Sequence, residues 1–425
     1  MSNKLNDNFA LKNGGFSNYA DTVSLARHRW YYYKEGFSPL LVDRAINEVG
    51  LKDNEIVLDP FNGSGTTTLS SAIKGYKSVG IEVNPFTAFL SDAKLKSASL
   101  SEIDKWFFKV FSSSKKQNKS ELLGYSTFSK KETLEKWLFN DSILNAFEGG
   151  WRSASEISSY NIRKLIKLTL INSAMDNCNA TRDGKCLRYR PKWEENGFNK
   201  ESFLESLLTN IEIIKNDIQS QPILSNAKII NGDARQVLKS NISADNFKLC
   251  ITSPPYLNTF DYTDIYRPEL FLGKFVRSSR ELYDLRLKTV RSHIQAKWKA
   301  PTSDNFGMLY QQSINHLNDH QENLMHKNIP LMVQAYFEDM LNILTLLRAK
   351  AAKDAELWLV VSNSAYADME IPVDLIIGEL GTKAGWYLKE IGVLRYIKRR
   401  KTKHSKSINT LRESVVIFSR NIKHR

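Results

Sequence analysis

The N-terminal part of the chain alternates between helical and strand-like spacing of its hydrophobic positions. Residues 38–49 have the apolar spacing of an amphipathic helix, with Ser38 placed as its N-cap. Strands are predicted at residues 56–58 and 78–83, with a helix between them at residues 67–74. A strand, a Gly-rich turn, a helix and a second strand in this order predict the first half of a doubly wound α/β sheet with mostly parallel strands.

The spacing changes in the middle of the chain, where helical periodicity dominates. It is strongest in four ranges, residues 103–111, 130–147, 157–177 and 203–219. Strand-like alternation returns at residues 227–230 and 248–252. The simplest interpretation is a large helical insertion between two halves of one sheet.

The C-terminal part is predicted to complete the sheet. The pattern predicts a helix, a strand, a helix and two further strands, at residues 333–348, 357–361, 373–380, 388–396 and 414–418. The last two strands are expected to pair as an antiparallel hairpin. The predicted division is a core of residues 1–98, 226–275 and 331–425, interrupted by a helical insertion at 99–225 and a basic insertion at 276–330.

Charge and cysteine content narrow the function classes. The formal net charge of +14 on 425 residues favours a polyanionic partner, although a merely basic surface would give the same number. No apolar stretch approaches the roughly 20 residues of a membrane span, and no signal peptide is recognisable, so we expect a cytoplasmic protein without membrane contact. Cys178, Cys186 and Cys250 form no Cys-x-x-Cys pair. We therefore expect neither a metal site nor structural disulfides.

A Gly-rich turn follows the first predicted strand. Gly63 and Gly65 allow a ligand to approach the backbone closely, and the turn lacks the Gly-Lys-Ser/Thr ending of an ATP- or GTP-binding loop. Glu82 ends the next strand, where a carboxylate can accept from both ribose hydroxyls of a nucleoside. The turn and the acid together favour a nucleoside ligand. The Gly-x-Gly-x-x-Gly spacing of a dinucleotide site is missing, which disfavours an NAD-dependent oxidoreductase.

The tetrapeptide Ser253-Pro254-Pro255-Tyr256 follows a predicted strand. Two prolines could simply end a strand, but that reading leaves the serine and the tyrosine unexplained. A hydroxyl and a rigidly held carbonyl can together accept both N–H groups of one amine, such as the exocyclic amine of a nucleic-acid base. Such an amine is a poor nucleophile because its lone pair is delocalised into the ring. The Ser253 hydroxyl and the Pro254 carbonyl could accept its N–H groups and stabilise the developing positive charge. Tyr256 could stack on a base swung out of a duplex.

The segment Asp-Pro-Phe-x-Gly-Ser-Gly-Thr-Thr at residues 59–67, with this tetrapeptide, resembles the motifs of the amino-methylating (N4-cytosine/N6-adenine) site-specific DNA methyltransferases. The resemblance covers about residues 25–98 and 226–275. It implies a Rossmann-like methyltransferase sheet and S-adenosylmethionine as cofactor, with Asp59 near the methionine end and Asp233 accepting from the adenine amine. The residues expected to bind the cofactor are Phe37, Asp59, Pro60, Phe61, Gly63, Gly65, Thr66, Glu82, Val83, Asn84, Asp233 and Ala234.

Within the family, serine at the first position of the tetrapeptide is commoner among cytosine-N4 enzymes, so N4-cytosine is favoured and adenine N6 is the alternative. None of the three cysteines follows a proline, which excludes the covalent mechanism of carbon-5 enzymes. An RNA methyltransferase or an inactive nucleic-acid-binding protein stays open. The resemblance implies the modification enzyme of a restriction-modification system, with a cognate restriction endonuclease as functional partner. We expect a monomer or a weak dimer.

Three basic segments compete for contact with duplex DNA, at residues 182–193, 277–299 and 399–406, and for each the alternative is a solvated charged surface. The side chains chosen as DNA contacts are Arg182, Lys185, Arg188, Arg190, Arg291 and Lys297. Asp261 and Tyr262, soon after the tetrapeptide, are candidate pocket residues.

Overall fold

A computed structural model describes the chain except for residues 1–3, 11–14, 17–18, 184–185, 400–406 and 422–425. Its central sheet has the strand order β1-β11-β12-β8-β7-β2-β3-β6. Along the sheet these strands are β1 (Leu5–Asn6), β11 (Tyr387–Lys398), β12 (Thr410–Ser419), β8 (Ala351–Ser362), β7 (Phe247–Thr252), β2 (Ile56–Asp59), β3 (Lys77–Glu82) and β6 (Ala227–Asn231). The strands from β8 to β6 are parallel, whereas β11 and β12 form an antiparallel hairpin beside β8.

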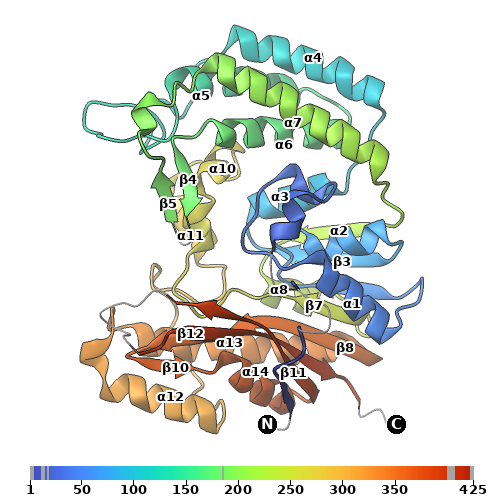
Figure 1. The fold of residues 1–425 in the computed structure, drawn as a ribbon, viewed down its shortest axis with the longest axis vertical. Helices are drawn as coiled ribbons and strands as arrows, with labels where there is room; N and C mark the ends of the chain where they lie inside the picture. The colour runs from blue at the N-terminus through green and yellow to red at the C-terminus, as the bar shows by residue number, and fades with distance from the viewer. Residues whose placement is uncertain (1–3, 11–14, 17–18, 184–185, 400–406, 422–425) are drawn as a thin grey trace.

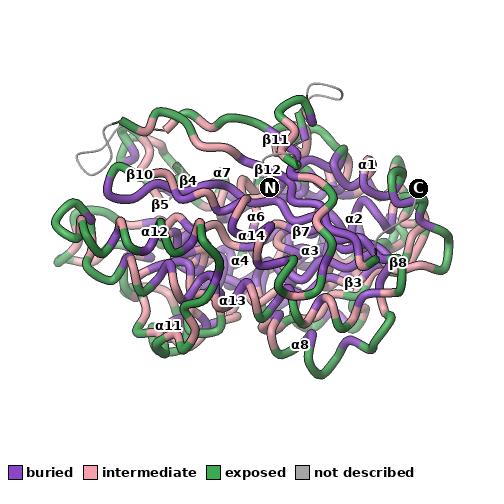
Figure 2. The backbone as a smooth tube through the Cα atoms, turned by 90° about the horizontal axis from the view of Figure 1, so that it is seen from below, coloured by how far each residue is buried: buried purple, intermediate pink, exposed green. Residues whose placement is uncertain are grey.

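Helices cover both faces of this sheet, because successive side chains of a strand point to opposite faces. Val57 and Leu249 pack with the buried side of α1 (Pro39–Val49). Leu58 and Cys250, one position further along, pack with α13 (Ile329–Lys350) and α14 (Val373–Lys383) on the other face. The predicted fold class, a doubly wound and mostly parallel sheet with a C-terminal antiparallel hairpin, is confirmed. Figure 2 shows the central strands buried and the outer side of α8 (Ala234–Ser240) exposed.

A separate layer of helices stands above the sheet (Figure 1). It contains α4 (Leu100–Lys116), α5 (Asp141–Ser155), α6 (Tyr160–Asp176) and α7 (Lys200–Ser220). Their apolar sides share one hydrophobic core with α3 (Pro85–Lys94), α10 (Arg267–Leu272) and α11 (Ser279–Arg286). The boundary predicted at residue 275 therefore falls within a segment whose helices on both sides pack into this helical core.

The remaining elements are short or peripheral. They are α2 (Thr66–Ile73), α9 (Tyr262–Ile265), α12 (Met308–Asp319), the strand pairs β4 (Ala180–Asp183) with β5 (Cys186–Tyr189) and β9 (Ser364–Tyr366) with β10 (Met369–Ile371), and the 3-10 turns η2 (Tyr19–Val23), η3 (His28–Trp30), η4 (Trp193–Glu195) and η5 (Gln321–Asn323). No helix in the described part of the chain is both long and apolar enough to cross a membrane.

One predicted helix is wrong over much of its length. Residues 130–147 were expected to be helical, but α5 begins only at Asp141. The amide groups of Leu138 and Phe139 donate instead to the carbonyls of Thr127 and Phe128, at 2.8 and 2.9 Å. Leu138 and Phe139 are buried and Leu134 and Trp137 are half-buried in this folded loop, so the apolar spacing resembles that of a helix although no helix forms.

Candidate active site

A cavity of about 340 Å³ lies at the carboxyl ends of β2, β3 and β7, the edge where parallel α/β sheets bind ligands. Each of these strands places a lining residue at its last position or directly after it, namely Asp59, Glu82 and Ser253. Of the residues predicted for cofactor binding and catalysis, those that line the cavity are Phe37, Asp59, Pro60, Phe61, Gly63, Thr66, Glu82, Val83, Asn84, Asp233, Ala234, Ser253, Pro254, Pro255 and Tyr256. Gly65 is absent from this lining.

The two positions in the turn require glycine for different structural reasons. Both have positive φ, +48° at Gly63 and +88° at Gly65. A Cβ at Gly65 would lie 2.7 Å from the Cβ of Ser91, so this glycine lets the start of α2 pack closely against α3. A Cβ at Gly63 would lie 3.2 Å from the Tyr33 hydroxyl, at the cavity wall. Gly63 can therefore contact a ligand directly, whereas Gly65 allows the turn to pack against α3, away from the cavity lining.

Glu82 is fixed at the end of β3 by backbone donors. Its Oε2 accepts from the Gly63 amide and its Oε1 from the Asn84 amide, both at 2.8 Å. Burial raises the pKa of the Glu82 carboxyl to about 6, and these two backbone hydrogen bonds oppose the rise. The carboxylate thus holds the Gly-rich turn in place and lies at the wall of the cavity.

Asp59 connects the Gly-rich turn to the strand that carries the tetrapeptide. Its Oδ1 accepts from the Thr252 hydroxyl at 2.5 Å and from the Phe61 amide at 3.0 Å. Burial raises the pKa of Asp59 to about 6, against the effect of these hydrogen bonds. The parallel register pairs Leu58 with Cys250, so Asp59 and Thr252 end neighbouring strands at the same edge.

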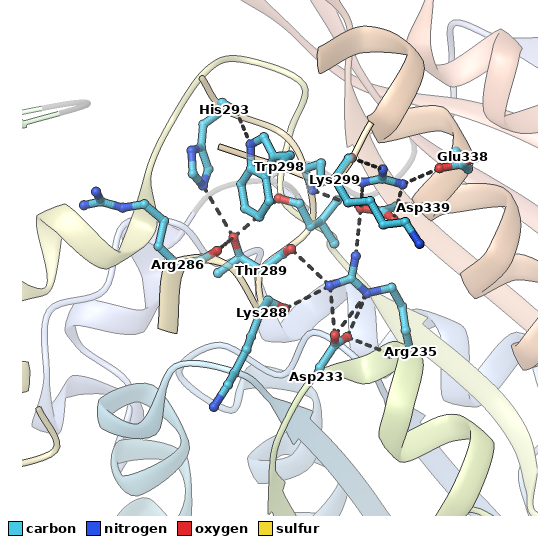
Figure 3. A network of polar contacts seen from close by, with 12 residues as sticks. Asp233, Arg235, Arg286, Lys288, Thr289, His293, Trp298, Lys299, Glu338 and Asp339 are labelled. Atoms are coloured by element: carbon cyan, nitrogen blue, oxygen red, sulfur yellow. Dashed lines mark hydrogen bonds and ion pairs between the residues drawn. The ribbon is translucent and has the colours of Figure 1, made fainter. Parts of the chain in front are cut away.

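Asp233, in the loop after β6, lines the cavity and is held by an arginine. Asp233 is the N-cap of α8, and its two carboxylate oxygens accept from the side chain of Arg235 at 2.8 to 3.1 Å. Arg235 also donates to the carbonyls of Lys288 and Thr289 and forms an ion pair with Asp339 at 2.9 Å (Figure 3). A ligand amine at Asp233 would have to share the carboxylate with this arginine.

The tetrapeptide turns away from the end of β7 and is held by the C-terminal hairpin. The Tyr256 hydroxyl donates to Oε1 of Glu413 on β12 at 2.8 Å, and burial raises the pKa of this tyrosine well above its usual value. Arg395 on β11 donates to Oε2 of the same carboxylate at 2.7 Å. Sequence reasoning missed Glu413 and Arg395, both of which line the cavity. They are far from the tetrapeptide in sequence and belong to no local motif.

Two tyrosines form an aromatic wall of the cavity. The rings of Tyr33 and Tyr266 stack with centroids 5.4 Å apart, and both line the cavity. Tyr266 donates its hydroxyl to Glu35, whose pKa is raised by burial. Of the two candidate pocket residues after the tetrapeptide, Tyr262 lines the cavity, while Asp261 is the N-cap of α9.

Several of the residues chosen as DNA contacts are bound within the protein. The Arg182 side chain is only 9% exposed, donates to the Tyr31 hydroxyl at 2.6 Å and forms an ion pair with Glu269. Arg190 donates to the Cys178 carbonyl at 2.8 Å. Such guanidinium groups are engaged within the protein and are poorly placed for phosphates.

The other candidates differ in exposure. Arg291 is held by Glu338 and Asp339, with its side chain 11% exposed. Arg188 and Lys297 are exposed. Lys185, like most of the basic loop at 399–406, lies outside the described residues. Among the residues that the structure describes, no cluster of three His, Cys, Asp or Glu side chains is arranged to hold a metal ion, and the three cysteines are unbridged.

Known proteins match both the motifs and the length of this chain. The family described as DNA methylase, N6_N4_Mtase, matches residues 9–90. Type II methyltransferase M.BsoBI of Geobacillus stearothermophilus is 30% identical over an alignment of 450 positions, which covers 92% of this chain and 85% of that protein. Type II methyltransferase M.AvaI of Nostoc sp. is 24% identical over an alignment of 414 positions, which covers 87% of this chain and 81% of that protein. With the Gly-rich turn, the buried acid and the tetrapeptide around one cavity, these similarities place the chain in the amino-methylating DNA methyltransferase family, as a methyltransferase of the type II kind.

Proposed function

We propose that this chain transfers the methyl group of S-adenosylmethionine to the exocyclic N4 amine of cytosine in duplex DNA. The hydrogen bond between Asp59 and Thr252 is the observation that supports this most. It ties the Gly-rich turn to the strand before Ser253, so a methyl donor and a base amine could meet in one cavity.

The cavity fits a nucleoside cofactor in its donors and acceptors. The Glu82 carboxylate lies at the wall and could accept from ribose hydroxyls. Asn84 Nδ2 is buried at the same wall and has no hydrogen-bond partner among the described residues, so an acceptor on a ligand would satisfy it. When bound, S-adenosylmethionine supplies an electrophilic sulfonium methyl group. Glu82 would hold the ribose, and Asp59 would lie near the methionine end.

The target base would enter from the side of the tetrapeptide. A base within a duplex is stacked, so its amine reaches a cavity only if the nucleotide swings out of the helix. Tyr256 would then cover one face of the base. The Ser253 hydroxyl and the Pro254 carbonyl would accept from the amine N–H groups and orient its lone pair. The rigid prolines fix these acceptors before the base arrives.

Serine at the first position of the tetrapeptide supports cytosine over adenine, because serine is the commoner residue there in the cytosine-N4 enzymes that the tetrapeptide resembles. Adenine N6 is the alternative, and the identity of the methylated nucleoside separates the two. We further propose that the chain modifies DNA against a cognate restriction endonuclease.

The duplex is proposed to lie across the opening of the cavity, between the helical layer and the C-terminal hairpin. Lys288 lines the cavity and is exposed, as is Lys297 in the segment that follows it. Cations in such positions attract phosphates over a range of about 10 Å in moderate salt. We accordingly assign DNA contact to the insertion at 276–330 through Lys288 and Lys297, and to the insertion at 99–225 through the exposed Arg188 and not through Arg182 or Arg190.

The function is tested by incubating duplex DNA with the protein and a methyl donor labelled at its methyl group. The DNA is then digested to nucleosides, which are identified by mass spectrometry. The expected product is labelled N4-methylcytosine. Labelled N6-methyladenine would replace the cytosine assignment with the adenine one, and an absence of label would contradict the enzymatic function.

A further inference from the structure

The side chains of Tyr256, Glu413 and Arg395 form a polar chain that leads away from the tetrapeptide. Tyr256 donates to Glu413 at 2.8 Å, and Arg395 donates to the other oxygen of that carboxylate at 2.7 Å. Arg395 and Glu413 are register partners on β11 and β12. The Glu413 side chain is 4% exposed, whereas that of Arg395 is 44% exposed. These three side chains therefore connect the cavity, through a buried carboxylate, to solvent.

Ser253 lines the same cavity three positions before Tyr256, at the position proposed for the amine. Its side chain lowers the pKa of the Tyr256 hydroxyl against the larger effect of burial, as a hydroxyl that donates towards that oxygen does. A serine hydroxyl has one donor and two acceptor positions, and a tyrosine hydroxyl can accept one hydrogen bond while it donates another. Ser253 can consequently accept from a base amine while it donates to Tyr256, which in turn donates to Glu413.

We propose that Glu413 acts through Tyr256 and Ser253 as a positioning residue that also takes up the proton released from the methylated amine. This inference rests on the proposed function. It answers a chemical need of the serine-type tetrapeptide, because Ser253 has no charge of its own to stabilise a positive nitrogen or to keep a proton. The C-terminal hairpin supplies the missing carboxylate.

The amine nitrogen gives its lone pair to the donor's methyl carbon, so a nitrogen–carbon bond forms while the sulfur–carbon bond breaks and its electron pair stays on sulfur. The nitrogen now carries a positive charge and one excess proton. That proton moves to Ser253 Oγ, the serine proton moves to Tyr256 Oη, and the tyrosine proton moves to Glu413. The methylated base is left neutral and Glu413 is left protonated, beside an arginine that reaches solvent.

Glu413→Gln tests this role, because glutamine preserves an acceptor for Tyr256 but removes the carboxylate. We expect the single-turnover rate of methyl transfer to fall about 10²-fold, within the range of general acid–base catalysis. The dissociation constants for S-adenosylmethionine and for the DNA duplex should not change. Tyr256→Phe should cause a similar fall, and the double variant should be no slower than the slower single variant, because members of one relay act as a unit.

The matched control is Glu390→Gln on the neighbouring part of β11, where the carboxylate accepts from Asn6 and does not line the cavity. This variant should transfer methyl groups at the wild-type rate. A wild-type rate in Glu413→Gln, or a fall explained only by weaker DNA binding, would overturn the relay. If Glu413→Gln does not fold, Tyr256→Phe decides, and a wild-type rate in that variant overturns the relay as well. Failure of the unaltered protein to methylate DNA would instead remove the proposed function.

Discussion

The Thr252 hydroxyl donates to Oδ1 of Asp59 at 2.5 Å, across the boundary between β7 and β2. Both side chains are almost completely buried. Because β2 and β7 are parallel neighbours, this bond fixes the Gly-rich turn and the tetrapeptide relative to each other at one edge of the sheet. Any change in Asp59 should consequently affect both stability and the reaction.

Asp59→Asn should make the protein more stable at pH 7.5 and less active. Burial raises the Asp59 pKa to about 6, while an unfolded aspartate titrates near 3.9, roughly two units lower. Between about pH 4 and pH 6 the folded state binds more protons, so this residue's contribution to the free energy of unfolding falls as pH rises. Asparagine removes the effect, and at pH 7.5 it should stabilise by up to about 3 kcal/mol.

The measurement is urea unfolding of variant and wild type at pH 4 and pH 7.5. The difference between them should be near zero at pH 4. Asp53→Asn, in the exposed turn before β2, serves as the control and should change little at either pH. Equal stability of Asp59→Asn and wild type at pH 7.5 would contradict the destabilising effect assigned to burial of the ionised Asp59 carboxylate.

Glu82→Gln should weaken S-adenosylmethionine binding by roughly 10- to 100-fold, the range for losing a hydrogen bond to a charged group. Glu82 also accepts from two backbone amides, and glutamine can satisfy only one of them with its carbonyl oxygen. In the wild type, affinity should fall as pH drops through about 6, because the Glu82 carboxylate becomes protonated there. Calorimetry from pH 7.5 to pH 5 should show this loss of affinity in the wild type and a smaller loss in the variant. The control variant Glu48→Gln should bind the cofactor as the wild type does at each pH.

Ser253→Ala should lower the rate of methyl transfer by about 10²-fold or more while cofactor binding stays intact, because one preorganised acceptor for the amine is lost. The comparison requires a single-turnover rate and a calorimetric dissociation constant on the same preparation. Full activity of this variant would count against the assigned role of the tetrapeptide. A parallel loss of cofactor binding would indicate a collapsed cavity instead.

Arg235→Gln should destabilise the protein by about 3 kcal/mol, since it leaves Asp233 without its cation and Asp339 with fewer partners. It should also raise amide hydrogen exchange around Lys288 and Thr289, whose carbonyls Arg235 binds (Figure 3). The matched control is Arg280→Gln, because Arg280 is 83% exposed and forms only a surface pair with Asp284. Its effect should stay within about 0.5 kcal/mol. Similar effects of the two substitutions would contradict a stabilising role for the ion pairs of Arg235 with Asp233 and Asp339.

The sequence allowed the strand ends and their motifs to be predicted because these depend on neighbours in the chain. Ser38 caps α1 by accepting from the Leu40 amide, as its position before Pro39 predicted. Asp59 and Glu82 stand at the ends of β2 and β3 because the hydrophobic strand pattern stops there. Two parallel strands then bring their ends together without further information.

The rest depends on contacts between distant residues, to which a local pattern is blind. Glu413 reaches Tyr256 across 157 positions, and nothing near either residue announces the pair. Arg182 was chosen from its basic neighbourhood, yet the fold buries it against Glu269. Composition cannot separate a cation that meets phosphate from one that meets an internal carboxylate.

A crystal structure with S-adenosylhomocysteine and a cognate duplex would show where the cofactor and the target base meet. We expect the ribose on Glu82, the sulfur beside Asp59 and an extruded cytosine stacked on Tyr256 with its amine facing Ser253. A cofactor bound outside this cavity, or a base whose amine lies away from the tetrapeptide, would rule out methyl transfer at this site.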